Sequence, residues 1–430
     1  MSTSVLLAAG NETWESQVVQ RLQQMPGLVL ARRCVDIADA VATTASGQAR
    51  IALFSLDLPG LDGDAVHRII EAGAHPIGLV ERADPRQATR ATALGLRGTL
   101  VIDELDELRH LVASIEESTS ELETATPGFE NVGGSSRGQL VAVWGPTGAP
   151  GRSTVALGIA SETAALGVPT LLIDADVYGG SVAQMLAMLD EVSGILAAAR
   201  SANAGALDLA ELSDHVRELT PTLRVLTGLP RADRWPGLRP ASFGAVLELA
   251  RQMASVVVVD LGFNLETEEE VTFDTAAPRR NGATVTALEQ ADDVVVVGSA
   301  DPLGLTRLTR SVYDLRDAVP GATTHVVVNK VRDSLGWSRD QIAQTVHRFV
   351  GVSPVMQLPL DQAAVDRAWL SGKTLAECAK DSPLRASLTR LARQLTVQDF
   401  AAIHASTATK RRRLPGLARR RARATPREAG

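Results

Sequence analysis

LVAVWGPTGAPGRSTVALGIA, residues 140–160, joins an apolar run to a helical pattern through a loop rich in glycine and proline. The apolar run is typical of a strand that is buried on both faces of a parallel sheet. In such a loop, backbone N–H groups and the positive end of the following helix form an anion cradle, which Gly148 and Gly151 leave open. The helix is expected to open at Ser153, and Ser153 and Thr154 offer hydroxyls for Mg²⁺. The loop alone fits an ordinary strand-to-helix turn equally well.

Three aspartates follow two further apolar runs. LLIDADVYGG places Asp174 and Asp176 at the end of one expected strand, and SVVVVDLGF places Asp260 at the end of another. Ligands of an open α/β sheet bind outside the carboxyl ends of its strands, and carboxylates there suit Mg²⁺. Each aspartate alone is also a common turn cap. Three of them beside a glycine-rich loop favour a site for a metal and a phosphate.

The surrounding sequence predicts two α/β domains. Residues 1–117 predict a small one, residues 118–138 a polar linker, residues 139–400 a second and larger one with a mostly parallel sheet, and residues 401–430 a basic, disordered tail. Helical patterns at 14–25, 63–73, 154–166 and 242–254 lie between the expected strands. Those strands are 4–8, 50–56, 77–80 and 99–102 in the first domain, and 140–144, 169–174, 223–228, 255–260, 293–298, 325–329 and 355–359 in the second.

Composition excludes several classes of protein. With 430 residues, 45% hydrophobic content and a net charge of −7, the chain is long and apolar enough for two cores. Residues 410–430 hold nine Lys or Arg against one acid, so the rest of the chain, the body, has a larger net negative charge than the whole chain. A broad nucleic-acid-binding face on the body is therefore not expected. The tail is either simply solvated or in contact with an anionic membrane or nucleic acid.

The sequence predicts a cytoplasmic protein, or one peripheral at the inner face of the membrane. Its two cysteines, Cys34 and Cys378, have no metal-binding spacing and form no disulfide framework. The N-terminus lacks the basic and apolar regions of a signal peptide. No uncharged apolar run reaches the roughly 18 residues of a spanning helix.

The order of these motifs resembles the MinD/ParA family of P-loop ATPases over about residues 139–395. The glycine-rich loop, IDAD, VVVVD, VVVNK and QLPLD carry the resemblance. The family's deviant Walker A loop reads K-G-G-x-G-K-[ST]. On TGAPGRS, Thr147 takes the place of the first lysine and Arg152 that of the second, and the positions between them are Gly148, Ala149, Pro150 and Gly151.

The resemblance implies ATP and Mg²⁺ as cofactors and gives each matching residue a role. The metal would be bound through Ser153, Asp174 and Asp260, with Asp260 in the Walker B position. Asp176 would orient the attacking water, and Arg152 would contact the β- and γ-phosphates. The nucleotide-binding residues would be Gly148, Ala149, Pro150, Gly151, Arg152, Ser153 and Thr154 in the loop, with Asn329, Pro359 and Asp361 at the adenine.

Two departures from the family pattern bear on hydrolysis. The chain has no lysine before Lys330, and Thr147 cannot deliver the charge that the family's first lysine brings to the partner's nucleotide. Arg152 keeps a charge, but its guanidinium is planar and larger than an ammonium. Because a cation supplied in trans is worth roughly 10³ to 10⁵ in rate, we expect nucleotide binding with slow or absent hydrolysis. Arg279 and Arg280 are candidate replacements, although a solvated pair that balances nearby glutamates is favoured.

IALFSLDLPGLDGDAV, residues 51–66, resembles the phosphoacceptor strand of receiver domains, where D-x-x-M-P-x-x-x-G is usual. Ser55 occupies the acceptor position and Leu58 the methionine position, and the first strand is followed only by Glu12 in place of an acidic pair. We expect a degenerate receiver-like domain that is not phosphorylated in the usual way and that docks a protein partner. An unrelated small α/β domain is the alternative.

A degenerate receiver joined to a MinD/ParA-like ATPase resembles pilus-assembly proteins of the CpaE/TadZ type and septum-site localisation proteins. This resemblance implies an ATP-binding spatial regulator for pilus assembly or cell division, with weak or absent hydrolysis. The implied partners are a second copy in a homodimer and a protein docked through residues 1–117, with no small-molecule metabolite. A hydrolysis-competent partition or septum ATPase and a pseudo-ATPase scaffold that binds no nucleotide are the alternatives.

Overall fold

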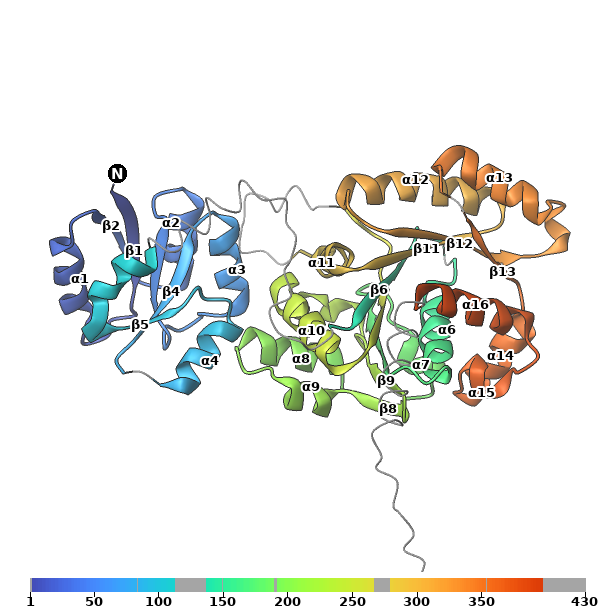
Figure 1. The fold of residues 1–430 in the computed structure, drawn as a ribbon, viewed down its shortest axis with the longest axis horizontal. Helices are drawn as coiled ribbons and strands as arrows, with labels where there is room; N and C mark the ends of the chain where they lie inside the picture. The colour runs from blue at the N-terminus through green and yellow to red at the C-terminus, as the bar shows by residue number, and fades with distance from the viewer. Residues whose placement is uncertain are drawn as a thin grey trace, which may run out of the picture.

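The computed structural model describes residues 2–82, 84–112, 137–148, 150–188, 192–266, 279–352 and 354–396. Within them, one five-stranded sheet and one eight-stranded sheet form the centres of two lobes (Figure 1). Most of the predicted linker and the whole predicted tail lie outside the described residues. In the part of the chain that is described, no helix has the length and apolar character needed to cross a membrane.

The smaller sheet is entirely parallel, with the strand order β2-β1-β3-β4-β5. This is the order of flavodoxin-like doubly wound folds. The strands are β1 (Thr3–Ala8), β2 (Leu28–Cys34), β3 (Ile51–Ser55), β4 (His75–Val80) and β5 (Thr99–Val101), and the helices between them are α1 (Glu15–Gln24), α2 (Ile37–Ala45), α3 (Gly63–Glu71) and α4 (Pro85–Ala93).

The larger sheet has the strand order β13-β12-β11-β6-β10-β7-β9-β8, and every neighbouring pair except β8–β9 is parallel. The predicted α/β class with a mostly parallel sheet is therefore confirmed. The strands are β6 (Gln139–Trp144), β7 (Thr170–Ala175), β8 (Arg217–Thr220), β9 (Leu223–Leu226), β10 (Val256–Leu261), β11 (Asp293–Ser299), β12 (Thr324–Val331) and β13 (Met356–Pro359).

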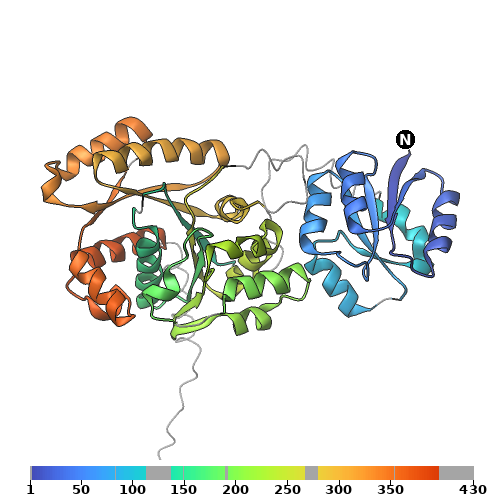
Figure 2. The same cartoon turned by 180° about the vertical axis from the view of Figure 1, so that it is seen from behind.

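Helices cover both faces of the larger sheet, as the views from the two sides show (Figures 1 and 2). Alternate valines of β10 enter opposite cores, with Val257 and Val259 on one face and Val256 and Val258 on the other. The first face packs against α8 (Gly194–Asn203), α9 (Leu209–His215), α10 (Pro240–Met253), α11 (Gly282–Gln290), α12 (Pro302–Ala318) and α13 (Arg339–Val350). The second packs against α6 (Arg152–Ala165), α7 (Val182–Met185), α14 (Gln362–Ser371), α15 (Leu375–Cys378) and α16 (Pro383–Leu395).

The two lobes meet where the start of α3 lies against α8 and α10. Arg239 forms an ion pair with Asp64 at 3.1 Å, and Asn203 donates a hydrogen bond to Asp62 at 2.9 Å. Asp62 also caps α3 by accepting a hydrogen bond from the backbone N–H of Ala65. One carboxylate thus begins the helix and fastens it to the larger lobe.

Candidate functional site

The glycine-rich loop lies between β6 and α6, and α6 begins at Arg152, one residue before the predicted start. Gly148 has φ 101° and Gly151 has φ 95°, a left-handed conformation that side chains rarely adopt. A Cβ on Gly151 would also lie 2.5 Å from Nδ2 of Asn329. The two glycines singled out in the sequence are therefore required by the backbone and, at Gly151, by close packing. Ala149 lies outside the described residues.

Arg152 turns its guanidinium back into the loop. Its Nη1 donates to the carbonyl oxygens of Gly145 and Pro146, at 3.3 and 3.0 Å, and its Nε donates to that of Leu261 at 3.1 Å. Its Nη2 lies 3.4 Å from Oδ2 of Asp176. Its side chain is only 12% exposed. Without a ligand, the one charged side chain of the loop is held by the protein's own oxygens.

Asp260 is the most unusual group of the site. The parallel register places it beside Val143 of β6 and Asp174 of β7. It is completely buried, and neither carboxylate oxygen accepts a hydrogen bond from the described residues. Burial first, and then the charge of Asp174, raise the pKa of the Asp260 carboxyl well above its usual range. The hydroxyl of Ser153 acts in the opposite direction, although it makes no hydrogen bond of normal geometry with either oxygen.

Asp174 is held differently from Asp260. Its oxygens accept hydrogen bonds from the backbone N–H groups of Asp176 and Val182, at 3.3 and 3.0 Å. A Cβ on Gly180 would lie 3.0 Å from its oxygens, and one on Gly228 would lie 2.8 Å from them. Burial raises its pKa to about 6, and the charge of Asp176 adds to the rise. Asp174 therefore closes the turn after β7, and each of its oxygens accepts one backbone hydrogen bond.

Asp176 faces the loop, as its predicted role requires. One of its oxygens accepts the backbone N–H of Tyr178 at 2.9 Å, and the other faces Arg152. Gly262, after β10, comes so near that a Cβ there would lie 3.2 Å from Oδ1 of Asp176. Asp176 thus lies between the turn after β7, the loop residue Arg152 and the end of β10.

The residues present fit a magnesium ion bound together with phosphates. Mg²⁺ keeps several waters and takes one or two protein oxygens beside those of a phosphate ligand. The hydroxyl of Ser153 and the unsatisfied oxygens of Asp260 would hold the ion. Among the described residues, no three His, Cys, Asp or Glu side chains form a metal site by themselves. The ion would therefore depend on the oxygens of a bound phosphate.

A cavity of about 320 Å³ opens beside the loop. It brings together nine of the predicted nucleotide-binding or catalytic residues: Pro150, Gly151, Arg152, Ser153, Thr154, Asp176, Asn329, Pro359 and Asp361. Gly148, Asp174 and Asp260 do not line it. Segments far apart in the sequence, from β6 to α14, thus meet at one hollow at the carboxyl ends of the strands.

Asn329 and Asp361 have structural partners within this cavity. Asn329 donates from Nδ2 to the carbonyl oxygen of Pro150 at 2.8 Å and so ties β12 to the loop. Asp361 caps α14 and accepts a hydrogen bond from Ser382 at 2.6 Å. Both side chains therefore shape the wall of the cavity in the absence of a ligand.

Several lining residues were not predicted from the sequence to lie at this site. Lys330, next to Asn329, adopts a left-handed φ of 61° and lines the cavity. Gln362, Val365 and Trp369 line it from α14. Their spacing of three and four residues is the signal that would have placed them on one helix face. Trp369 remains 42% exposed.

The arginines considered as replacement cations have other contacts. Arg280 lies over the ring of Tyr178, 4.0 Å from its centroid, and donates to the carbonyl oxygen of Val177. Arg279 lines a different cavity, between the two lobes. The glutamates that were expected to balance this arginine pair lie outside the described residues, apart from Glu266. Neither arginine forms a hydrogen bond or an ion pair with the described residues of the glycine-rich loop.

A second cavity lies at the end of β3 in the smaller lobe. It encloses about 330 Å³, and Glu12, Ser55 and Asp57 are among its lining residues. Ser55 is buried, and its hydroxyl accepts the backbone N–H of Asp57 at 3.2 Å. Ser55, which the sequence places where a phosphoacceptor was expected, is therefore engaged in its own turn.

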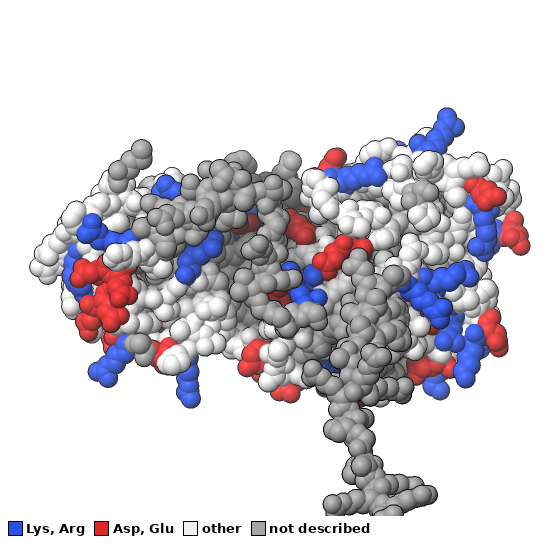
Figure 3. All heavy atoms as spheres, in the orientation of Figure 1, with Lys and Arg blue, Asp and Glu red and all other residues white. Residues whose placement is uncertain are grey.

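Basic and acidic side chains are both present on each lobe on the face drawn in Figure 3.

Comparison with known proteins finds similarity at the level of structure. No protein-family model matches the chain, and no curated protein matches it. The solved ParA family ATPase from Chlorobium tepidum TLS superposes with a TM-score of 0.50 at 16% identity, over 59% of this chain and 98% of its own. The larger lobe therefore has the MinD/ParA-like P-loop NTPase fold.

Two further solved structures cover similar shares. The cell division ATPase MinD from Pyrococcus furiosus gives a TM-score of 0.48 at 16% identity, over 61% of this chain and 99% of its own. The septum site-determining protein MinD from Pyrococcus horikoshii, solved with Mg-ADP, gives 0.47 at 16%, over 62% and 98%.

Proposed function

We propose that this chain is an ATP-binding spatial regulator of the MinD/ParA type, which binds Mg-ATP and hydrolyses it slowly or not at all. The observation that carries the proposal is Asp260, a fully buried carboxylate with no hydrogen bond, behind Ser153 of a glycine-rich loop. Buried polar groups are nearly always satisfied, and strongly perturbed acids gather at functional sites. A metal ion and a phosphate would give Asp260 the partners that the protein does not.

Three features of the loop support slow hydrolysis. Thr147 is exposed and uncharged where the family places its first lysine. Arg152 is engaged with three carbonyl oxygens, and Asp176 with Arg152 and a backbone N–H. Phosphoryl transfer depends on charges positioned around the transferred group. Here the cation and the water-orienting carboxylate face each other.

Calorimetry and a phosphate-release assay test the proposal together. We expect the full chain to bind Mg-ADP and a non-hydrolysable ATP analogue, and to release little phosphate from ATP. Ser153→Ala should weaken Mg²⁺-dependent binding by roughly tenfold, because it removes a ligand of the ion. Rapid turnover that Asp176→Ala abolishes would instead identify a hydrolysis-competent partition or septum ATPase.

One observation favours a second candidate, a pseudo-ATPase scaffold. The guanidinium of Arg152 already satisfies the carbonyl oxygens of the loop, so the loop is stable without a phosphate. If neither nucleotide binds at millimolar concentration, with or without Mg²⁺, the scaffold becomes the better description.

We further propose that residues 1–117 are a degenerate receiver that docks a protein partner, in the manner of the CpaE/TadZ type. The strand order of the smaller sheet and the serine at position 55 support this proposal. Since the start of α3 is covered by the larger lobe, the partner would use another face. Incubation with acetyl phosphate should leave the domain unmodified; a phosphorylated Asp57 would contradict the proposal.

Homodimer formation and contacts of the basic tail belong to the same proposal. Light scattering with and without the ATP analogue should show a shift from monomer to dimer. Co-sedimentation with anionic liposomes, compared between the full chain and residues 1–409, tests the tail, because each basic residue near an anionic surface contributes about 1 kcal/mol. Equal sedimentation would remove the membrane from the proposal.

A further inference from the structure

Arg307, on the second turn of α12, lies against the glycine-rich loop from a distant part of the sequence. A Cβ added to Gly148 would be 2.2 Å from Nη1 of Arg307 and 3.3 Å from its Cζ. The guanidinium therefore occupies the space directly over Gly148. Gly148 follows Thr147, which takes the place of the family's first lysine.

The charge of Arg307 is unpaired within the described residues. Arg307 is half-buried and forms neither a hydrogen bond nor an ion pair with them. The nearest acid on its own helix, Asp301, accepts hydrogen bonds from Ser299 and from the backbone N–H of Gly304. Arg152, by contrast, has four oxygen neighbours. Arg307 is thus a cation at the loop with its donors still available.

The fold holds Arg307 in this place through tight packing of α12. A Cβ on Gly304 would lie 2.5 Å from the carbonyl oxygen of Ser299, and one on Gly298 would lie 2.6 Å from Leu308. Leu308, the neighbour of Arg307, is fully buried. Two glycines therefore bring the helix close to β11, and the buried leucine fixes its rotation, so that Arg307 is aimed at the loop.

We propose that Arg307 binds the terminal phosphates of the nucleotide and supplies, from the same chain, the positive charge that Thr147 lacks. This inference rests on the proposed nucleotide binding. Arginine suits the role because its planar guanidinium forms paired hydrogen bonds with phosphate oxygens. The site would then combine a cation on each side of the loop, with Arg152 from α6 and Arg307 from α12.

Titrations with Mg-bound ATP analogue, Mg-ADP, inorganic tripolyphosphate and adenosine test this role in the full chain. Arg307→Ala should weaken binding of the ATP analogue and of tripolyphosphate about tenfold, which corresponds to ~1.4 kcal/mol. Adenosine binding should stay unchanged, because adenosine has no phosphate. Arg307→Lys should recover part of the loss, which a purely structural role would not predict.

The matched control is Arg310→Ala, one turn along the same helix, where the side chain is exposed. It should leave all four affinities within twofold of the wild type, and circular dichroism should show that each variant is folded. Equal ATP-analogue affinity in wild type and Arg307→Ala would overturn the inference while leaving the proposed function intact. A wild type that binds neither nucleotide nor tripolyphosphate would overturn the proposed function, and this inference with it.

Discussion

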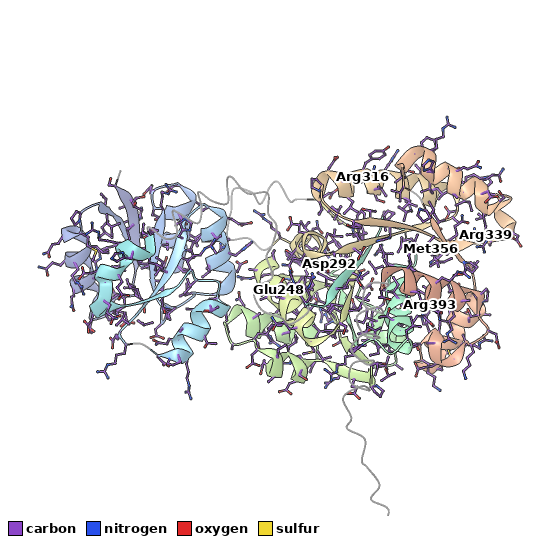
Figure 4. The ribbon with its side chains drawn as sticks, in the orientation of Figure 1. Glu248, Asp292, Arg316, Arg339, Met356 and Arg393 are labelled. Atoms are coloured by element: carbon purple, nitrogen blue, oxygen red, sulfur yellow. The ribbon has the colours of Figure 1, made fainter. Side chains whose placement is uncertain are left out.

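Aspartates at the two ends of the strands of the eight-stranded sheet differ in whether the protein supplies their hydrogen bonds. We call these two ends the carboxyl edge and the amino edge. At the carboxyl edge, Asp260 has no hydrogen bond, and its pKa is raised. At the amino edge, Asp292 accepts hydrogen bonds from Arg251 and from the backbone N–H of Leu140, at 2.6 and 2.7 Å. Figure 4 labels Asp292 at this edge. Asp292 is satisfied by the protein itself, whereas the oxygens of Asp260 have no hydrogen-bond partner among the described residues.

Asp293, next to Asp292 at the amino edge, also has hydrogen-bond partners within the protein. It contacts Nε2 of His325 and accepts from Gln139, both at 2.6 Å. Burial works against ionisation, but the hydrogen bonds from His325 and Gln139 hold the pKa of the Asp293 carboxyl below its usual range. The pKa values of two aspartates on one sheet are thus shifted in opposite directions, because the groups around them differ. The comparison separates aspartates with partners inside the protein from Asp260, for which we proposed a ligand.

The largest expected effect is on ligand binding at the carboxyl edge. Asp260→Asn removes the charge that Mg²⁺ would meet and should weaken Mg²⁺-dependent nucleotide binding by roughly 10- to 100-fold. Calorimetry with Mg²⁺ and with EDTA measures the difference. The variant should be at least as stable as the wild type at pH 8, because an unpaired buried charge has been removed. Unchanged Mg²⁺ dependence would contradict the assigned role.

At the amino edge, the expected effect is on stability. Asp292→Ala leaves Arg251, which is 5% exposed, without its carboxylate, and should lower the free energy of unfolding by about 2 kcal/mol. Urea denaturation measures the change. Nucleotide affinity should stay within twofold, so a loss of binding at unchanged stability would break the distinction between the edges.

The next effect is smaller and concerns how the stability contributed by Asp293, at the amino ends of the strands, depends on pH. Because the pKa of Asp293 is lowered in the folded state, its contribution is present above the unfolded pKa of about 3.9 and is lost as the pH falls below it. The stability difference between wild type and His325→Leu should be about 1 kcal/mol at pH 6 and should shrink by pH 3. Urea denaturation at both pH values is the measurement. A difference that grows on acidification would show that the sign is wrong.

The smallest expected effect concerns the mouth of the cavity. Trp369→Phe keeps an aromatic ring and should change nucleotide affinity by less than about threefold. A fluorescence change on nucleotide addition should be present in the wild type and largely lost in the variant. Replacement of the exposed Trp337 by Phe is the control. A response that persists without Trp369 would place the nucleotide elsewhere.

The sequence predicted the buried parts of the sheets better than their rims. Strands such as β10 are continuous valine runs, which have few alternatives in an α/β protein. The strands β2 and β8 were missed, and both lie at a sheet edge. RELT has no apolar run, and in LVLARRC the short run LVLA gives way to two exposed arginines. Neither sequence has the long apolar run that marks the central strands of the larger sheet.

The candidate site could be predicted where a residue's place at the end of a strand already fixes its place in the sheet. The loop and the strand-end aspartates were found because parallel strands deliver their carboxyl ends to one edge. The state of Asp174 could not be predicted, since it depends on Gly180 and Gly228, whose missing side chains make room for it. Arg307 carries no local signal, because only the tight packing of α12 brings it to the loop.

The corner at the start of α3 has a consequence for how this chain can be rearranged. Asp62 caps its own helix through the backbone N–H of Ala65 and contacts the other lobe through Asn203. Asp64, in the first turn of the same helix, forms an ion pair with Arg239. A chimera with a foreign N-terminal domain would preserve the attachment only if that domain also began a helix with acids two residues apart. This polar corner of the joint is therefore built from three residues of one module and two of the other, beside a second contact in which Gly205 packs against Leu94 and Arg90.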